Sequence, residues 1–358
     1  MPDLLLWPRR FAKSVLARAV DPFLPSNAPL ILVYHRVVED FDRERQRMMQ
    51  GTLVSQAMLA RHLECIGRVR EFTTLDELSR HWASGRPFTR PLAAVTFDDG
   101  YRDVYENAFP ILQRRGIPAA VFVVTSLVGT SLPQTHDRVY RLLTRALPGW
   151  ANPSADLARL LADAGVSPRR RLDEGGGAST ASTLTRRLLT RLPRARLLAV
   201  IDRLESLLEP DDVEPAEGAL PMTWSMLREM RRAGVVVGSH TRHHVLMPRE
   251  RRGVMRDEAA RSRRDLEAHL EGPIEHFAYP DGAFNRDAMD AIEQAGYRFG
   301  YTACAHRDAS RPWLTIPRRT LWEHSAVDSL GRFSAPMLRC QAQGLLAGRR
   351  GCTWYSHA

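Results

Sequence analysis

Residues 91–100 read PLAAVTFDDG, and this stretch decides the fold. Its apolar part, Pro91–Phe97, predicts a buried strand, and Asp98-Asp99-Gly100 predicts the turn that ends the strand. In parallel α/β folds, ligands bind at the carboxyl ends of the strands. Two neighbouring carboxylates at such an end can therefore take different tasks, one binding a cation and the other acting as a base. The alternative is an acidic turn that caps the next helix.

Further apolar runs alternate with helical stretches along the chain. Strands are predicted at Ala28–Val38, Pro118–Val124, Val235–Gly238, Ile274–Tyr279 and Tyr297–Ala303. Helices are predicted at Val104–Arg115, Trp224–Ala233, Glu250–Leu270 and Asn285–Ala295, with Thr223 as an N-cap and Gly234 as a stop. Such alternation indicates an α/β fold with a parallel sheet or barrel.

Residues 131–220 interrupt this alternation with several helical pieces and a loop that starts at Arg169. We interpret this stretch as a helical insertion in one domain, residues 28–330, and not as a domain of its own. A basic amphipathic segment, residues 1–27, precedes that domain. A Gly- and Arg-rich tail, residues 331–358, follows it.

The composition excludes several classes of protein. Of 358 residues, 44% are hydrophobic and 26% are charged, which is typical of a globular chain and not of a disordered chain, a collagen or a coiled-coil rod. No apolar run approaches the roughly 18 residues that a membrane-spanning helix needs. The net charge is +10, almost all from arginine, with Lys13 as the single lysine. Because the charge is scattered and no nucleic-acid motif is present, we expect no nucleic-acid partner.

The cysteines and the N-terminus predict a cytoplasmic location. Cys65, Cys304, Cys340 and Cys352 form no metal or redox motif, which indicates thiols in a reducing compartment. The first apolar run ends at Trp7 and arginines follow it, the reverse of the order in a secretory signal. Residues 4–20 mix apolar and basic side chains. They predict either a basic amphipathic helix on the inner face of a membrane or a helix packed on its own domain.

A histidine cluster follows the strand at residues 235–238. Three of the 12 histidines, His240, His243 and His244, fall within five positions. A lone histidine would usually be a surface or core residue, but His240 and His244 share one face if the segment is helical. Imidazole is a ligand for Zn²⁺, Cu, Fe and Ni. We therefore predict a metal site, with His243 pointing away from it.

The two clusters together predict a hydrolase. Two histidines and one aspartate supply three ligands, which leaves an open position on a catalytic metal. Zn²⁺ lowers the pKa of a bound water to about 7, and the second aspartate can accept its proton. This chemistry suits the hydrolysis of an amide or an ester.

With these motifs in order, the sequence resembles the polysaccharide deacetylases with a NodB homology domain, carbohydrate esterase family 4. The first motif is TFDDG at 96–100, and the second is SHTRHH at 239–244. Weaker likenesses are FAYPDG at 277–282, LTIPR at 314–318 and VYHRV at 33–37. The resemblance covers residues 28–130 and 220–322. It implies a distorted (β/α) barrel of the NodB homology type, here with a helical insertion.

The resemblance also implies roles for particular residues. Asp98 would be the catalytic base, and Asp99, His240 and His244 would hold a divalent metal, expected to be Zn²⁺. The substrate-binding residues would be Tyr279, Pro280, Asp281 and Arg318, with Tyr279 and Pro280 shaping a groove and the Asp281 backbone N–H stabilising an oxyanion.

Two positions depart from the family pattern. Ala278 stands where the family has an arginine that orients the base, and Arg318 is a candidate to supply that charge from the last strand. Ile316-Pro317-Arg318 stands where the family has a histidine that acts as general acid. His306 and His324 are candidate substitutes, although surface positions are the simpler interpretation for both.

The main functional hypothesis is a polysaccharide deacetylase, an enzyme that removes N-acetyl groups from amino sugars in a poly- or oligosaccharide. Asp98 would take a proton from a metal-bound water that attacks the acetamide carbonyl. One alternative is a deacetylase or deformylase of a lipid-linked sugar at the membrane. A second alternative is a catalytically weak glycan-binding module, although a binding module has no need of the Asp98, Asp99, His240 and His244 set.

Overall fold

The apolar runs form a ring of parallel strands in the computed structural model, which describes residues 7–21, 27, 29–166, 180–208, 219–304 and 306–346. The ring contains β1 (Leu30–Tyr34), β5 (Leu92–Phe97), β6 (Ala119–Val123), β7 (Val236–Ser239), β8 (His276–Ala278) and β9 (Phe299–Thr302). Neighbouring strands pair in parallel. Every residue of β1, β5 and β6 is buried, and strands buried on both faces need continuous apolar runs.

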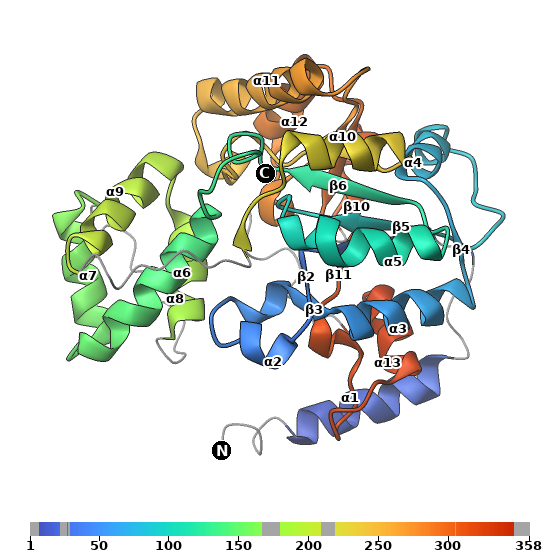
Figure 1. Ribbon diagram of the computed structural model, residues 1–358, viewed down its shortest axis with the longest axis horizontal. Coiled ribbons are helices and arrows are strands. Elements are labelled where there is room, and N and C mark those ends of the chain that lie inside the picture. The colour runs from blue at the N-terminus through green and yellow to red at the C-terminus, as the bar shows by residue number, and fades with distance from the viewer. Residues whose placement is uncertain are drawn as a thin grey trace.

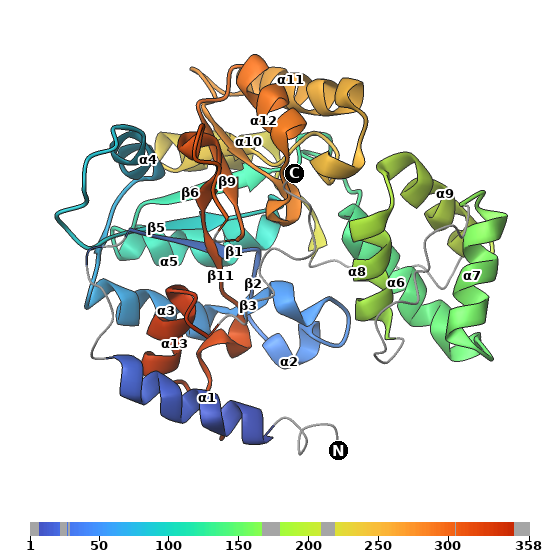
Figure 2. The same ribbon diagram turned by 180° about the vertical axis from the view of Figure 1, so that it is seen from behind.

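The ring closes through one extended segment near residue 318. β10 (Ile316–Pro317) pairs with β9, and β11 (Arg319–Thr320) pairs with β1. Only Arg318 separates β10 from β11, so the two strands at the ends of the series, β9 and β1, are joined and the ring is closed. The predicted distorted (β/α) barrel is confirmed (Figures 1 and 2).

Three short strands lie beside the ring. β4 (Glu71–Phe72) pairs with the start of β5. β2 (Arg36–Val38) and β3 (Leu53–Ser55) form a small parallel sheet. The single strand predicted at Ala28–Val38 is therefore two strands, interrupted at His35.

Helices cover the outside of the barrel (Figures 1 and 2). They are α3 (Gln56–Gly67), α4 (Leu75–Ala83), α5 (Phe109–Arg114), α10 (Trp224–Arg232), α11 (Arg252–His269) and α12 (Arg286–Gln294). The predicted cap of α10 is confirmed, because the Thr223 side chain accepts the Met226 N–H and Gly234 follows the helix with φ +88°. The predicted helix at Val104–Arg115 begins instead with a π-helical turn, Val104–Ala108, before α5.

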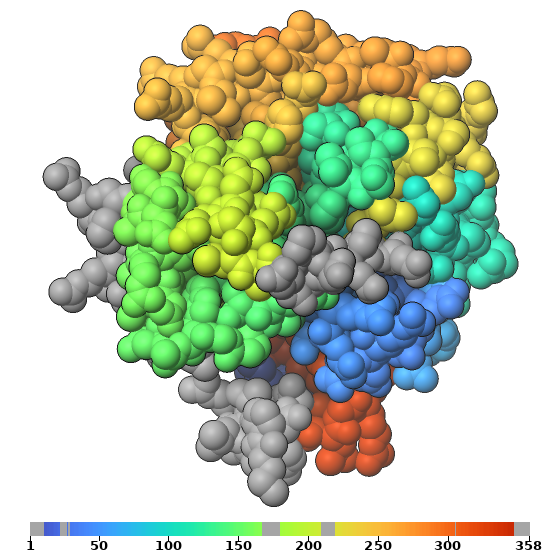
Figure 3. Space-filling view, turned by 60° about the vertical axis from the view of Figure 1, so that its left-hand side comes forward, coloured from blue at the N-terminus to red at the C-terminus, as the bar shows by residue number. Residues whose placement is uncertain are grey.

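The stretch predicted as an insertion contains four helices that form a lobe beside the barrel (Figure 3, green). They are α6 (Thr135–Ala146), α7 (Pro153–Asp163), α8 (Ala181–Arg191) and α9 (Arg194–Glu205). Their apolar side chains, among them Leu143, Leu188 and Ile201, form a hydrophobic cluster separate from the main barrel core. The loop predicted at Arg169 lies outside the described residues.

Helices from the two ends of the chain lie against each other. α1 (Trp7–Val20) packs on α13 (Ala335–Ala342), and α13 also contacts α3. The short helix α2 (Phe41–Glu44) follows β2. Residues 347–358 of the predicted tail lie outside the described part of the chain. Among the helices that are described, none is both long and apolar enough to cross a bilayer.

Gly282→Ala is expected to destabilise the protein by about 2–4 kcal/mol. Gly282 has φ +69°, and a Cβ atom there would lie 2.1 Å from the backbone nitrogen of Ala303. The control is Gly253→Ala in α11, where an added Cβ has no neighbour within 4 Å. That control should be neutral or stabilising, because alanine favours helix over glycine. Urea unfolding midpoints compare the two, and equal midpoints would refute the expected clash.

A buried histidine predicts an acid-sensitive core. His62 on α3 is fully buried, its Nδ1 lies 3.2 Å from the Tyr34 hydroxyl, and burial lowers its pKa to about 3. An unfolded histidine binds a proton below about pH 6.5. Between pH 6.5 and about 3 the unfolded state therefore holds more protons, so stability falls as the pH falls.

His62→Gln removes this proton-binding difference. The free energy of unfolding should then fall less steeply with acidification, by at most about 1.4 kcal/mol per pH unit. Urea unfolding at several pH values between 6.5 and 4 measures the slope. An unchanged slope in His62→Gln would contradict the prediction.

Candidate metal centre and active site

The paired carboxylates lie where β5 ends, as the sequence predicted. Asp98 continues the pairing with β1, because its N–H donates to the Tyr34 carbonyl at 2.9 Å. Asp99 and Gly100 then turn the chain with φ values of +70° and +73°. Aspartate tolerates this left-handed conformation better than most residues do. Both carboxylates are buried, at 4% and 3% exposure, and they point to different partners.

The histidine segment lies at the end of β7, beside the carboxylates. It is a turn, so the condition under which the spacing would place both histidines on one helical face is not met, and Thr241 and His244 adopt left-handed φ values of +66° and +55°. The turn nevertheless directs both histidines to one atom. The Nε2 atoms of His240 and His244 lie 3.5 Å and 3.2 Å from Oδ1 of Asp99. The structure thus brings together the three predicted metal ligands.

The hydrogen bonds of His240 leave one ring nitrogen facing Asp99. Its Nδ1 lies 2.8 Å from the carbonyl of Ala278, so Nδ1 carries the proton and Nε2 is the acceptor. Burial lowers the pKa of His240 to about 4, which keeps the ring neutral at pH 7. A metal-binding histidine needs this arrangement, in which the far nitrogen donates to a carbonyl. The backbone carbonyl of Ala278 therefore holds His240 in the tautomer that a metal ligand needs.

Asp99 has the electrostatics of a metal ligand. Burial would raise the pKa of this carboxyl, but His136 and His244 beside it hold the pKa well below its ordinary value. For His244, burial would lower the pKa, but contact with Asp99 raises it. Oδ1 of Asp99 is buried and has no hydrogen-bond partner in the described structure. A buried ionised oxygen needs a compensating charge. A divalent cation beside His240 and His244 would supply it, so the residues present fit a metal.

The other carboxylate, Asp98, is held by the residue that closes the barrel. The two terminal nitrogens of Arg318 donate to the two Asp98 oxygens at 2.8 Å and 2.7 Å. Arg318 also donates to Thr96 Oγ1 at 3.1 Å and is 1% exposed. Burial would raise the pKa of Asp98, but the Arg318 charge lowers it below the ordinary value. Asp98 is therefore an oriented, ionised carboxylate.

The contacts of Arg318 decide between its two predicted roles. Arg318 contacts the predicted base, Asp98. This agrees with the first role, which we proposed because Ala278 stands where the family has an arginine. The second role, substrate binding, differs from the structure. The guanidinium of Arg318 is buried, pairs with Asp98 and lies over the Phe122 ring at 5.0 Å.

The third motif contributes one residue to the pocket surface. Asp281, with φ +58°, is exposed and lines a pocket together with the metal-site residues. Tyr279 is 0% exposed and Pro280 is also buried, so their side chains lie behind the surface. This differs from the groove-shaping role predicted for them. His243 contacts Glu258 at 2.7 Å, away from Asp99, as expected.

Sequence reasoning missed His136, the second residue of α6. Its Nε2 lies 3.7 Å from Oδ2 of Asp99 and 2.7 Å from the Tyr101 hydroxyl. Ligand atoms of Asp99, His136 and His244 all lie within 4.8 Å of one another, so His136 is a further candidate ligand. Because His136 follows no strand and belongs to the helical stretch, only its residue type could have drawn attention to it.

The pocket at this site is lined by residues of the barrel and of the helical insertion. His35, at the break between β1 and β2, faces it from the barrel, and Arg186 and Leu189 face it from α8. Neither His306 nor His324 is among the residues that line it. His324 instead packs against the rings of Phe41 and Trp322.

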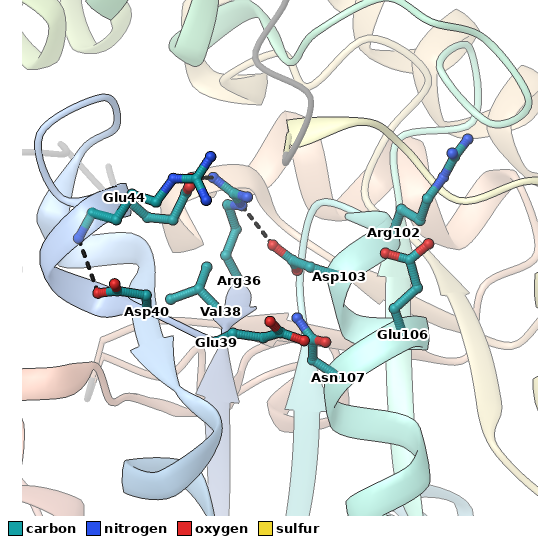
Figure 4. Close-up of a pocket in the computed structure, with 10 residues that line it drawn as sticks. Arg36, Val38, Glu39, Asp40, Glu44, Arg102, Asp103, Glu106 and Asn107 are labelled. Atoms are coloured by element: carbon teal, nitrogen blue, oxygen red, sulfur yellow. Dashed lines mark hydrogen bonds and ion pairs between the residues drawn. The ribbon is translucent and has the colours of Figure 1, made fainter.

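A second pocket, beside β2, has paired charges (Figure 4). Its buried Arg36 donates to Asp103 at 2.7 Å and lies over the Tyr101 ring at 5.3 Å. Burial raises the pKa of Asp103 to about 6 in spite of this arginine. Tyr101 in turn donates to Asp137, next to His136. The buried Arg36 of this pocket is therefore linked through Tyr101 to Asp137, the neighbour of His136.

Comparisons with known proteins agree with this geometry. Residues 85–168 and 174–300 match the model of the polysaccharide deacetylase family. The chain belongs to this family. A poly-beta-1,6-N-acetyl-D-glucosamine N-deacetylase of Staphylococcus aureus is 30% identical over 113 residues, which are 29% of this chain and 38% of that protein. The chain thus matches well under half the length of this curated relative.

Solved structures of deacetylases share the fold. The Streptococcus pyogenes deacetylase PplD, in complex with acetate, superposes with a TM-score of 0.54 at 16% identity, over 87% of this chain and 97% of that one. IcaB from Ammonifex degensii superposes with a TM-score of 0.54 at 20% identity, over 88% and 97%. Both likenesses support the barrel architecture of the family.

The Asp98–Arg318 pair predicts a strong coupling in stability. Arg318→Met is expected to destabilise the protein by about 3–5 kcal/mol, because it leaves the Asp98 charge buried and unpaired. Asp98→Asn combined with Arg318→Met should destabilise it by clearly less than the sum of the single changes. Urea unfolding of the two single variants and the double variant measures the coupling. Additive effects would show that the pair is not coupled.

Proposed function

We propose that the protein is a metal-dependent deacetylase that removes N-acetyl groups from amino sugars in a poly- or oligosaccharide. The proposal rests on one observation, that two neighbouring carboxylates at the end of β5 have different partners. Asp98 is ionised and oriented by Arg318, while its neighbour Asp99 meets His240 and His244. A base beside a three-residue metal site is the arrangement that amide hydrolysis needs.

In this proposal each residue has a defined task. A divalent ion held by Asp99, His240 and His244 would polarise the acetamide carbonyl and acidify a water. Asp98 accepts the proton of the attacking water, and Arg318 stabilises the carboxylate until that moment. The C–N bond then breaks, the leaving nitrogen takes the proton that Asp98 accepted, and the products are the free amine and acetate. Asp281, at the pocket edge, is placed to face the sugar.

The proposed substrate is a polymer of N-acetylglucosamine. The match to a poly-beta-1,6-N-acetyl-D-glucosamine N-deacetylase supports this class of glycan. Arg186 and Leu189 line the same pocket, so the proposed substrate would contact the insertion as well as the barrel. We propose Zn²⁺ as the ion, since two imidazoles and one carboxylate suit it.

The alternative substrate, a lipid-linked sugar at the inner face of a membrane, is favoured by one observation. The outer face of α1 exposes Phe11, Val15 and Leu16 among basic side chains.

A cytoplasmic location is supported by the cysteines, because Cys65, Cys304 and Cys340 are buried and form no disulfide among the described residues.

Asp98→Asn is the test of the proposed function. We expect kcat/KM for acetate release from N-acetylglucosamine oligomers to fall about 10²–10⁴-fold, because the general base is lost. Bound metal should stay at the level of the unchanged protein, since Asp98 is not among the proposed ligands. Asp99→Ala is the matched variant and should lose the metal as well as the activity. Full activity in Asp98→Asn would overturn the assignment of the base.

A further inference from the structure

The outer face of α1 carries an apolar stripe. Phe11, Val15 and Leu16 are 49%, 53% and 51% exposed. Ser14 and Ala17, at 7% and 0%, form the opposite, buried face. A soluble helix normally turns its large apolar residues inward and its small or polar residues outward. Among the described side chains of α1 this order is reversed, since Val15 and Leu16 are half exposed while Ser14 and Ala17 are buried.

α1 is firmly attached to the molecule through its small residues. Ala17 packs in a cluster with Met337, Cys340 and Leu346. Next to the helix end, Nε and Nη2 of Arg339 donate to the two carboxylate oxygens of Asp21. The helix α1 lies at the edge of the molecule (Figures 1 and 2). The attachment fixes the rotation of the helix about its axis and so keeps the half-exposed side chains on its outer face.

Basic side chains flank the stripe on both sides. At about 100° per residue, Phe11, Ala12, Val15, Leu16 and Ala19 fall within one continuous arc. Arg18 lies at one border of this arc and Lys13 beyond the other, and both are exposed. The helix sequence, WPRRFAKSVLARAV, contains four basic residues and no acidic one. An apolar stripe between basic borders matches the interface of an anionic bilayer, where acyl chains lie beneath negative headgroups.

The dimensions of α1 favour a lipid surface over a protein partner. Its 14 residues span about 21 Å, too short to cross the roughly 30 Å hydrocarbon core, but sufficient to lie flat on it. Three half-exposed apolar side chains offer far less than the ~800 Å² per partner of a stable dimer. A bilayer requires no such area, since the attraction of basic side chains to anionic headgroups adds to the insertion of a few apolar side chains.

We propose that α1 binds the surface of an anionic lipid bilayer, with Phe11, Val15 and Leu16 inserted below the headgroups and Lys13 and Arg18 among them. The attachment of α1 to α13 then holds the barrel at the membrane surface. This proposal does not rest on the proposed deacetylase activity.

Co-sedimentation of the full chain with vesicles tests the proposal. Vesicles of phosphatidylcholine with one quarter phosphatidylglycerol are compared with pure phosphatidylcholine, at low and high salt. We expect binding to the anionic vesicles, at least 10-fold weaker binding to the neutral ones, and loss of binding at high salt. Equal binding to both vesicles, or none to the anionic ones, would overturn the proposal.

Charge substitutions locate the binding surface. Val15→Glu combined with Leu16→Glu should weaken binding to anionic vesicles at least 10-fold. Leu330→Glu is the control, because Leu330 is 62% exposed on another segment, and it should bind like the unchanged protein. Unchanged binding in the α1 variant would refute the role of the stripe. A drop in molecular mass by light scattering in that variant would refute it in favour of a second copy.

The fold and the site serve as independent checks on these variants. Circular dichroism melting should be the same for all three proteins. Acetate release from a soluble oligosaccharide should also be unchanged, since α1 is not among the pocket residues. Failure of vesicle binding in the unchanged protein with retained hydrolysis would overturn the membrane proposal alone, whereas vesicle binding without hydrolysis would overturn the proposed function alone.

Discussion

The ion pair between Asp98 and Arg318 is the interaction on which the rest of the site depends. Arg318 lies in the one segment that joins β9 to β1, and Asp98 ends the strand β5 that pairs with β1. The two side chains therefore meet across the seam of the barrel. Burying two charges costs several kcal/mol unless the geometry is good. The bidentate contact, with Thr96 as a further partner, meets that condition and fixes the direction of Asp98.

Arg318 holds the side chain of Asp98, and the side chain of Asp99 lies on the opposite side of the same turn. Successive side chains along extended backbone diverge, and the left-handed φ of Asp99 turns it further from Asp98. Asp99 then meets imidazoles on both oxygens, His240 and His244 at Oδ1 and His136 near Oδ2. One strand end thus separates a proton acceptor from a cation ligand, although the residues are neighbours in the chain.

The sequence predicted those parts of the structure that depend on local pattern. Buried parallel strands are apolar runs, and their carboxyl ends share one edge, so Asp98, Asp99, His240 and His244 were assigned to one site without knowledge of distances. Arg318 was a candidate only through the family resemblance, which implies an arginine beside the base at the position where this chain has Ala278. The burial of Tyr279 and the place of His136 were not predictable in this way. Both depend on how distant segments pack, and His136 reaches Asp99 only because α6 docks beside the Tyr101 hydroxyl.

The docking of the insertion is polar where it meets the barrel. Its apolar side chains form their own cluster, so burial of apolar surface holds the four helices together but does not join them to the barrel. The join uses directional contacts instead. Tyr101 contacts His136 and Asp137, Arg249 donates to the Thr190 carbonyl at 2.7 Å, and the Arg194 N–H donates to Glu250 at 2.6 Å. Hydrogen bonds fix orientation more strictly than apolar contact does, because they depend on angle as well as distance. The insertion wall of the pocket, Arg186 and Leu189 on α8, is therefore positioned from two sides, by Tyr101 next to the metal-site turn and by the segment at Arg249 and Glu250.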